Sequence, residues 1–509
     1  MEGYEHAAMA DPFARAVSFF MQLIADLSGP DTLSLPHQVV EETAAKQGRE
    51  LARLLLQAHL DLRAHREETR LRKLDGTARA ALADGRTRLE CGHHRELATV
   101  VGTVTVARCA LRSPGRPNAY PADAVLGLPR ERHSLGVRKL AVLEAVRGSY
   151  DTALEAVTRA CGKVAGKRQL EHLVRAAAVD VAAFYAARTP QPASASTLLV
   201  LSADGKGIVM RPAHLREATR KAAERARRTF RTRLATGEKT GRKRMATLAA
   251  VYDAEAAVRR PHDIIAPPGG RSDTRTPRPG PKARAKWLTG SIEHDPDHVI
   301  AAAFDQAAAR DPQHQRCWVV LIDGARHQRE VIQAEAARRD LRIHIVLDIV
   351  HVIEKLWAAA RCFYPATDPD AEHWIAAKAA RILRGCADRA ADEIRAEADD
   401  RHLAAEDRTG VDKVCQYLHH NADFIHYEKA LASGWPIASG VIEGAARHLI
   451  ADRLDITGSR WSVPGAEAVL LVRVVQANGD MPQYWDFHLH AEQHRLHPAA
   501  DKVNYKLTA

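Results

Sequence analysis

The pattern of apolar and polar positions separates a helical N-terminal part from a later part in which strands and helices alternate. Residues 13–27 and 37–66 carry apolar side chains at helical spacing, which predicts two helices. Residues 97–111, LATVVGTVTVARCAL, are rich in β-branched side chains around a glycine and predict a small hairpin. The N-terminal part is therefore expected to be mostly helical, with one small β element.

Three short helices are expected between residues 134 and 187, because glycines interrupt the helical pattern at Gly148 and around Gly162–Gly166. This arrangement fits a helix-turn-helix-like unit, whose third helix would begin with the basic pair Lys167 and Arg168. A plain helical bundle fits the same pattern equally well.

A Pro/Ser/Ala-rich stretch, RTPQPASAS at 188–196, marks the clearest domain boundary. After it, residues 261–286 are rich in Pro, Gly and Arg and predict a loop, whereas residues 370–432 predict helix without any strand. Apolar runs predict strands at 197–203, 244–253, 317–322 and 341–348, separated by helical segments.

Two of these apolar runs end in Asp-Gly, at Asp204 in LVLSADGKG and at Asp323 in VVLIDGARHQ. One such pair is usually a turn. If the two strands lie side by side, however, the carboxylates share one edge of the sheet and offer the oxygen ligands that two Mg²⁺ ions need. Glu443, in WPIASGVIEGAARHLI, begins a helix among small and apolar residues and is a candidate third ligand, although alone it fits a helix-capping role.

The charge of the chain is concentrated in one segment. The formal net charge is +11, and the stretch Arg211–Arg244 alone holds 13 Lys and Arg residues against three acids. Because this excess lies beside the candidate acids, it predicts contact with a polyanion such as DNA. The basic residues expected at that contact are Lys206, Arg225, Arg227, Arg228, Arg231, Arg233, Lys243 and Arg244.

Several long blocks together resemble the ISKra-type transposases of bacterial insertion sequences, which are DDE enzymes related to Mutator-like element transposases. The resemblance extends from about residue 45 to about residue 500. It is carried by LSADGKGIVMRP, GEKTGRKRMATLAAVYD, VVLIDGARHQ, VLDIVHVIEKLWAAA and GWPIASGVIEGAARHLI.

The resemblance implies an α/β RNase H-like catalytic core with an all-α insertion, preceded by a mostly α N-terminal DNA-binding region with a small β-hairpin. Asp204, Asp323 and Glu443 would hold two Mg²⁺ ions, for which Mn²⁺ can substitute. The expected segments are a helical region (1–90), a hairpin with the helix-turn-helix-like unit (91–190), the first part of the core (196–360), the helical insertion (361–434), and the last part of the core with C-terminal helices (435–509).

Two further motifs match this transposase group. Asp348 and His351, in DIVH, lie on one helical face and can both point at the active-site edge, where they would orient a water, a phosphate or Asp323. A helix cap followed by a partly buried histidine is the simpler alternative. In GSRWS, Arg460 and Trp461 would contact DNA, with Trp461 stacking on an unpaired base unless it belongs to the core. Arg447 is a further expected DNA contact.

A zinc site is not expected. Members of the family often carry paired cysteines in a zinc ribbon, but here Cys91, His93, His94 and Cys109 have irregular spacing. The histidines of FHLHAEQHRLHP, beginning at His488, predict a surface helix instead of a metal site.

The expected function is therefore Mg²⁺-dependent DNA cleavage and strand transfer at the ends of an insertion sequence. The partners would be double-stranded DNA, as terminal inverted repeats and target, and further copies of the chain in a homodimer or higher homo-oligomer. No apolar stretch approaches the roughly 18 residues that a membrane helix needs, and no secretory signal is evident, so a cytoplasmic location without membrane association is expected. Two alternatives remain open: a catalytically silent, transposase-derived DNA-binding regulator, and another RNase H-like nuclease such as a resolvase.

Overall fold

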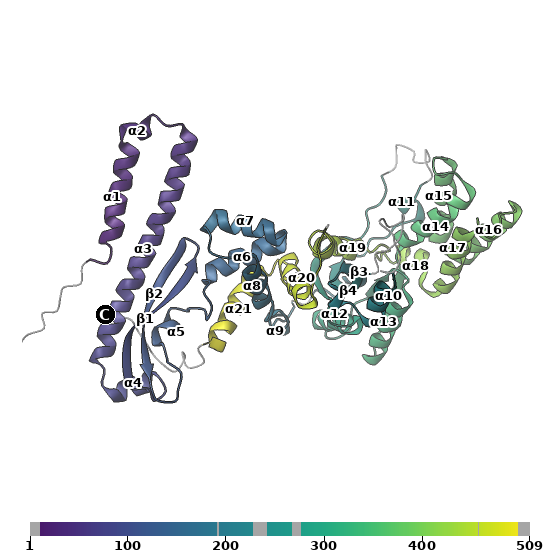
Figure 1. The fold of residues 1–509 in the computed structure, drawn as a ribbon. Helices are drawn as coiled ribbons and strands as arrows, with labels where there is room; N and C mark the ends of the chain where they lie inside the picture. Colours follow the sequence, from purple (N-terminus) through teal and green to yellow (C-terminus); the bar gives the residue numbers. More distant parts are fainter. Residues whose placement is uncertain (1–10, 191–192, 227–241, 267–275, 457, 497–509) are drawn as a thin grey trace, which may run out of the picture. The chain divides into compact units, whose positions relative to one another are not determined.

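The computed structural model describes residues 11–190, 193–226, 242–266, 276–456 and 458–496. The chain divides into two compact units, unit 1 with residues 1–184 and 482–509 and unit 2 with residues 185–481 (Figure 1). The last predicted segment, 435–509, is thus divided between the two units.

Unit 1 begins with a helical hairpin and a β-hairpin, as predicted. Leu60, on the second long helix, packs with Leu97, Val104 and Val106 of the two strands. The strands turn at Gly102, whose φ of +127° favours glycine. The elements are α1 (Ala14–Ser28), α2 (Pro30–Leu33), α3 (His37–Lys73), α4 (Gly76–Leu82), β1 (Arg88–Thr99), β2 (Gly102–Arg112) and α5 (Pro121–Val125).

The three predicted short helices follow, with breaks at the predicted glycines. They are α6 (Leu135–Arg147), α7 (Tyr150–Cys161) and α8 (Lys167–Ala178). Gly148 and Gly162 follow the first two helices, and Gly162 has a φ of +80°. Serine hydroxyls cap α6 and α7 by accepting backbone N–H bonds.

The last described helix, α21 (Met481–Leu496), packs in unit 1 through a buried ionic network. His488 is only 3% exposed, and its Nδ1 lies 2.7 Å from Asp180 Oδ2. Arg495 donates two hydrogen bonds to the same carboxylate, of 2.6 and 2.9 Å. The prediction of a surface helix is therefore wrong for His488, because the histidine pairs with an acid that lies about 300 residues earlier in the chain.

This network predicts a pH-dependent contribution to stability. Burial raises the pKa of Asp180, but hydrogen bonds from Arg495 and His488 outweigh it, so the pKa lies below its usual value. A depressed pKa means that the contribution is present above the unfolded pKa of about 3.9 and is lost as the pH falls through the folded pKa. Asp180→Asn is expected to reduce the unfolding free energy of unit 1 by about 2 kcal/mol at pH 7 and by less near pH 3, where the contribution is already being lost. Hydrogen exchange of α21 in both proteins at the two pH values measures this difference, and an equal effect at both values would contradict it.

Unit 2 is built on a mixed five-stranded sheet with the order β5-β4-β3-β6-β7. The first three strands of this order are antiparallel, whereas β3, β6 and β7 are parallel to one another. Figure 1 shows α12 and α13 on one side of the strands and α19 on the other, so both faces are covered. The strands are β3 (Leu198–Val209), β4 (Lys243–Ala254), β5 (Ala283–Ser291), β6 (Trp318–Ile322) and β7 (Ile343–Leu347).

Two features of the sheet differ from the sequence prediction. Strand β3 does not end at Asp204 but continues to Val209, because β4 pairs with it along its full length. Strand β5 was missed, since its first residues lie in the stretch 261–286 that predicts a loop. It is an edge strand whose first half is largely exposed, so it lacks a continuous apolar run.

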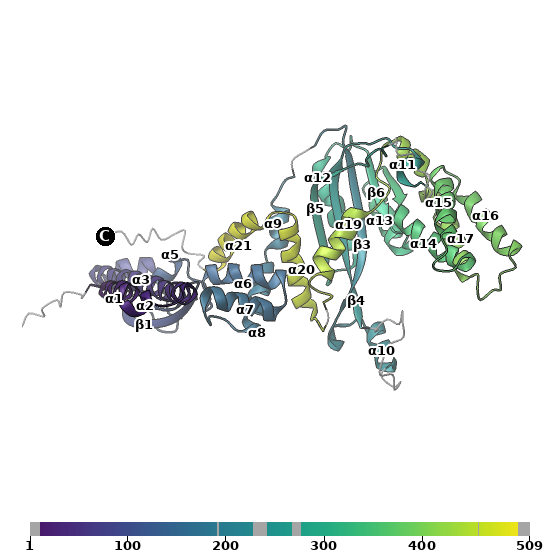
Figure 2. The same ribbon diagram turned by 90° about the horizontal axis from the view of Figure 1, so that it is seen from above.

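Helices surround the sheet and fill the segment between β7 and the end of unit 2. Residues 361–434, all of which are described, contain no strand, as predicted. Figures 1 and 2 both show α14 to α17 grouped together beside the sheet. The helices of unit 2 are α10 (Glu217–Ala226), α11 (Pro261–Ile264), α12 (Pro296–Arg310), α13 (Arg326–Arg338), α14 (Ile349–Phe363), α15 (Asp370–Leu383), α16 (Ala387–Asp400), α17 (Thr409–His420), α18 (Tyr427–Ala432), α19 (Gly440–Ala445) and α20 (Val463–Ala477), and a π-helical turn, η3 (Ala446–Ala451), directly continues α19.

A buried ionic group fixes the start of the central strands. Asp253, near the end of β4, receives hydrogen bonds from Arg316 at 2.6 Å and from Arg310 at 3.4 Å. The Arg316 side chain is 1% exposed and also donates to the carbonyls of Thr197 and Leu198. This group ties β3, β4 and Arg316, two residues before β6, together, and so helps to set the register of the strands. Across the described ranges, no helix is long and apolar enough to span a membrane.

Candidate metal centre

Three aspartates lie on or directly after three neighbouring strands: Asp204 in β3, Asp323 after β6 and Asp348 after β7. Residues of β3 pair with residues of β6 that come 119 positions later, as in Leu199 with Trp318, and the same offset joins Asp204 to Asp323. Residues of β6 pair with residues of β7 that come 25 positions later, and this offset joins Asp323 to Asp348. The ladder continues to this level, since Asp348 N donates to Ile322 O at 2.8 Å. Extended by one or two residues past the last printed pairs, this register brings the three aspartates to the same edge of the sheet, and Asp323 is close enough to Asp204 to raise its pKa.

Glu443 reaches this edge from α19, which packs on β3 and β4. Its carboxylate lies beside Asp348 and His351, and one ligand atom from each of the three residues falls within 4.8 Å of the others. Within the described ranges, this is the one group of three or more His, Cys, Asp or Glu side chains that could hold a metal ion. Asp348 is buried, His351 is half-buried and Glu443 is exposed, so the group opens to solvent.

Ser439 connects the two carboxylates of this group. Its hydroxyl contacts Asp348 Oδ2 and lies 3.0 Å from Glu443 Oε1, while its backbone N–H donates to Asp348 Oδ2 at 3.1 Å. One hydroxyl has one proton to donate, so it cannot serve both acids at once. Two carboxylates held this close repel each other unless a proton or a cation lies between them.

The pKa directions agree with this crowding. Burial raises the pKa of Glu443, and the nearby Asp348 raises it further, against the hydrogen bond from Ser439 and the nearby His351. Burial likewise raises the pKa of Asp204, with a further increase from Asp323, against the Gly205 N–H, His351 and Lys206. Each acid is therefore harder to ionise in the protein alone, which is the situation that a bound cation relieves.

The structure brings only part of the predicted site together in one group. The converging group consists of Asp348, His351 and Glu443, whereas the expected ligands are Asp204, Asp323 and Glu443. Asp204 lies close to this group, because both Asp323 and His351 affect its pKa. Asp348 also caps α14 by accepting the Val350 N–H at 2.8 Å, so the capping alternative is correct for it without excluding a ligand role.

Backbone contacts hold the acid-bearing loops in place. Asp323 Oδ1 accepts the Ala325 N–H at 2.8 Å, and the Tyr417 hydroxyl donates to Asp323 O at 2.8 Å. Burial raises the pKa of Tyr417, as do Asp323 and Asp348, so its hydroxyl stays protonated and remains a donor. In the same way, the Tyr427 hydroxyl donates to Leu347 O at 2.9 Å. Tyr417 and Tyr427 were not found from the sequence, since nothing local distinguishes them from core tyrosines.

The predicted DNA-contacting residues of unit 2 differ in solvent exposure and in whether they already form ion pairs or hydrogen bonds within the protein. Arg225, Arg447 and Arg460 are exposed, and Lys206 is half-buried two residues after Asp204 on the same strand. Lys243 forms an ion pair with Asp455 at 2.9 Å. Arg244 donates to the carbonyls of Ile292 and Glu293, so it joins strand β4 to the end of β5.

The remaining predicted contacts need separate comment. In unit 1, Lys167 and Arg168 are exposed at the start of α8, and Lys167 forms an ion pair with Asp151 at 2.6 Å. Arg227, Arg228, Arg231 and Arg233 lie outside the described residues.

Trp461 is a core residue, so the prediction that it stacks on a base is wrong. Its side chain is 7% exposed, and its Nε1 donates to Leu454 O at 2.9 Å. Its backbone also pairs with the end of β3, where Arg211 N donates to Trp461 O at 2.8 Å. The indole is therefore already packed and hydrogen-bonded within unit 2.

The irregular Cys and His set of unit 1 forms pairs. Cys109 Sγ lies 3.4 Å from Cys91 Sγ across the hairpin. His93 is held by Glu90, with Nε2 at 3.3 Å from Oε1, and by the Tyr120 hydroxyl.

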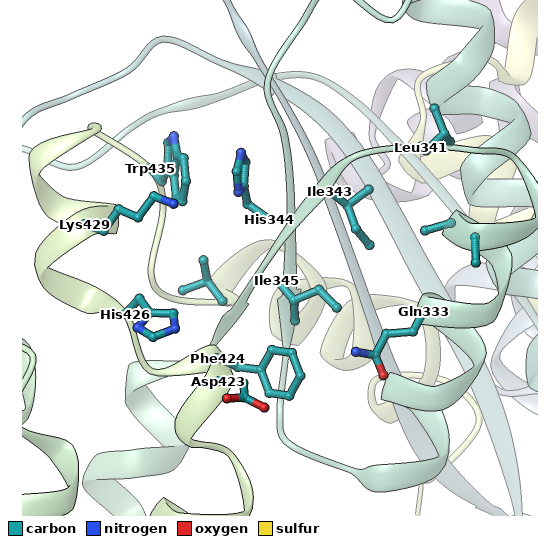
Figure 3. Close-up of a pocket in the computed structure, with 13 residues that line it drawn as sticks. Gln333, Leu341, Ile343, His344, Ile345, Asp423, Phe424, His426, Lys429 and Trp435 are labelled. Atoms are coloured by element: carbon teal, nitrogen blue, oxygen red, sulfur yellow. The ribbon is translucent and has the colours of Figure 1, made fainter.

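A cavity of about 420 Å³ follows the outer edge of β7, and none of Asp204, Asp323, Asp348 and Glu443 lines it (Figure 3). His344 stacks on Trp435 with ring centroids 4.3 Å apart, and Lys429 and His426 line the same side. The candidate metal centre is therefore a separate site at the edge of the sheet, built from side chains on β3, α14, α19 and the residue after β6. Searches of protein-family models and of curated proteins found no match to this chain.

Proposed function

We propose that the chain is a DDE transposase with an RNase H-like core, which cleaves DNA strands at the ends of an insertion sequence and joins them to a target. The observation that carries this proposal is the position of Asp204 in β3, Asp323 directly after β6 and Asp348 directly after β7, with Glu443 beside Asp348. The mixed five-stranded sheet and the helical segment 361–434 between the second aspartate and the glutamate also support it.

The carboxylates fit hard divalent cations. Asp204, Asp323 and Glu443 would hold Mg²⁺ or Mn²⁺, which supplies Lewis-acid activation of the attacking hydroxyl and neutralises charge on the phosphate. An imidazole is a poorer ligand for Mg²⁺ than a carboxylate, so His351 is better suited to orienting water or a phosphate oxygen. Its Nδ1 lies 3.2 Å from Glu354 Oε2, which leaves Nε2 for that contact. Asp348 and Ser439 would fix the position of the Glu443 carboxylate.

A strand-cleavage assay tests the proposal. The full chain is incubated with a labelled duplex made from the DNA that flanks its gene, with Mg²⁺, with Mn²⁺ or with EDTA. We expect metal-dependent nicks that expose a 3′-hydroxyl, followed by products joined to target DNA. Release of unjoined products only would favour another nuclease, and binding without cleavage would favour a DNA-binding regulator.

The basic segment makes a separate prediction. Replacing Arg225, Arg227, Arg228, Arg231 and Arg233 by glutamine is expected to weaken DNA binding irrespective of sequence, since these charges would neutralise phosphates. The slope of log affinity against log salt should fall by about 0.9 for each lost phosphate contact. Fluorescence anisotropy across a salt series measures this slope, and an unchanged slope would contradict the contact.

A further inference from the structure

A second cavity, of about 520 Å³, lies beside the acidic edge and is lined by basic side chains. It lies among α13, α14 and α17, so the helical segment 361–434 supplies one of its walls. The side chains that matter for its chemistry are Arg326, Arg329, Glu330, Lys355, Lys413 and Tyr417.

The charges of this cavity favour an anion. Four cationic side chains line it against one carboxylate, that of Glu330, which forms an ion pair with Arg326 at 2.7 Å. Lys355 and Lys413 are exposed, and across the described part of the chain neither forms an ion pair with a carboxylate. Their ammonium groups are therefore available for a ligand.

The wall of the cavity is partly fixed in place. Arg329 donates to His420 O at 3.3 Å and to Asn421 Oδ1 at 3.2 Å, so α13 is joined to the end of α17. Lys355 Nζ lies 5.7 Å from the centre of the Tyr417 ring, which attracts the ammonium group. A cavity held in this way needs little reorganisation to accept a phosphate.

The cavity adjoins the candidate metal centre directly. Gly324, which lines it, follows Asp323 and has a φ of +88°, and an added Cβ there would lie 2.9 Å from the Tyr417 hydroxyl. Lys355 comes one helical turn after His351 on α14, so the two share a face. Acidic and basic sites are thus neighbours, with Tyr417 contacting both.

We propose that this cavity binds a backbone phosphate of the DNA strand that enters the candidate metal centre. The inference rests on the proposed function, because that function places a phosphodiester at the acids. Neighbouring phosphates of the strand must then pass close by, and Lys355 and Lys413 would hold one of them. The helical segment would thereby position the substrate strand relative to Asp323.

Lysine footprinting and matched variants test the cavity. The full chain carrying Asp323→Asn is mixed, in EDTA, with a mixed-sequence duplex of about 30 base pairs, and acetylation of each lysine is followed by mass spectrometry. We expect DNA to slow acetylation of Lys355 and Lys413 severalfold. Lys355→Gln with Lys413→Gln should weaken binding about tenfold and reduce the salt slope by about 0.9, because the two lysines together would hold one phosphate.

Arg361→Gln with Arg389→Gln is the matched control, since both arginines are exposed on α14 and α16 outside the cavity and the charge change is equal. Equal affinity of the two double variants, or unprotected lysines, would overturn the inference. Footprinting measures binding without divalent metal, so its result is independent of cleavage. If the lysines are unprotected but the unmodified chain cuts DNA, only the proposed phosphate site is wrong. Protected lysines in a chain that never cuts DNA would refute the proposed function instead.

Discussion

Asparagine in place of Asp204 or Asp323, or glutamine in place of Glu443, is expected to reduce metal-dependent DNA cleavage by about a thousandfold or more. Each change keeps the shape of the side chain but removes the negative charge that would bind the cation. Cleavage of an end-labelled duplex, quantified on denaturing gels in Mg²⁺ and in Mn²⁺, measures the loss. Affinity for the same duplex in EDTA should stay within about twofold, because these acids oppose rather than aid the binding of phosphate.

Asp297→Asn is the control for this series, since Asp297 is an exposed acid on α12, away from the aligned aspartates. It should leave cleavage unchanged. If the variant at Asp204, Asp323 or Glu443 keeps full activity, that residue is not part of the proposed centre. If the Asp204 variant and the Asp323 variant are both fully active, the proposal is wrong.

The second large effect concerns stability. Asp253→Ala is expected to reduce the free energy of unfolding of unit 2 by about 3–5 kcal/mol, because it leaves the buried guanidinium groups of Arg316 and Arg310 without their carboxylate. Burial already lowers the pKa of Arg310 against the effect of Asp253, so the acid compensates a real cost of desolvation. Hydrogen exchange of the β3 and β6 amides measures the loss.

Glu255→Ala provides the comparison for Asp253→Ala. Glu255 lies two residues further along and pairs with Arg284 at 2.9 Å, but both side chains are about two-thirds exposed. An exposed pair of this kind contributes at most about 1 kcal/mol. Similar losses for the two variants would show that burial of the Asp253 group does not matter for stability.

Much of the fold followed from local patterns, because apolar runs, glycines and β-branched stretches act over a few residues. The breaks at Gly148 and Gly162 are examples, and so is the absence of strands from 361–434. Edge strand β5 was missed since half of it is exposed and lacks a continuous apolar run. His488 was misplaced because its partner Asp180 is distant in sequence.

The candidate site was only partly predictable. The Asp-Gly pairs pointed to Asp204 and Asp323, but local sequence cannot give the register that aligns them with Asp348. Glu443 was a candidate from its place at a helix start among small and apolar residues, whereas the pairing of Asp348 with His351 came from a family resemblance. Their convergence depends on Ser439, whose contact with Asp348 spans 91 residues. Trp461 was ambiguous because Trp beside Arg is common both in cores and at nucleic-acid surfaces.

The contact between Asp348 and Ser439 joins the two ends of the long helical segment between β7 and α19. A second contact joins the same two ends, since Ile349 N donates to Ile437 O at 2.9 Å. Closing a longer loop costs little, only about 0.6 kcal/mol for each doubling of its length. The entropic cost of joining the two ends therefore depends little on how many residues lie between them. Tyr417 and Tyr427 are the parts of this segment that hold the acid-bearing loops, through Asp323 O and Leu347 O.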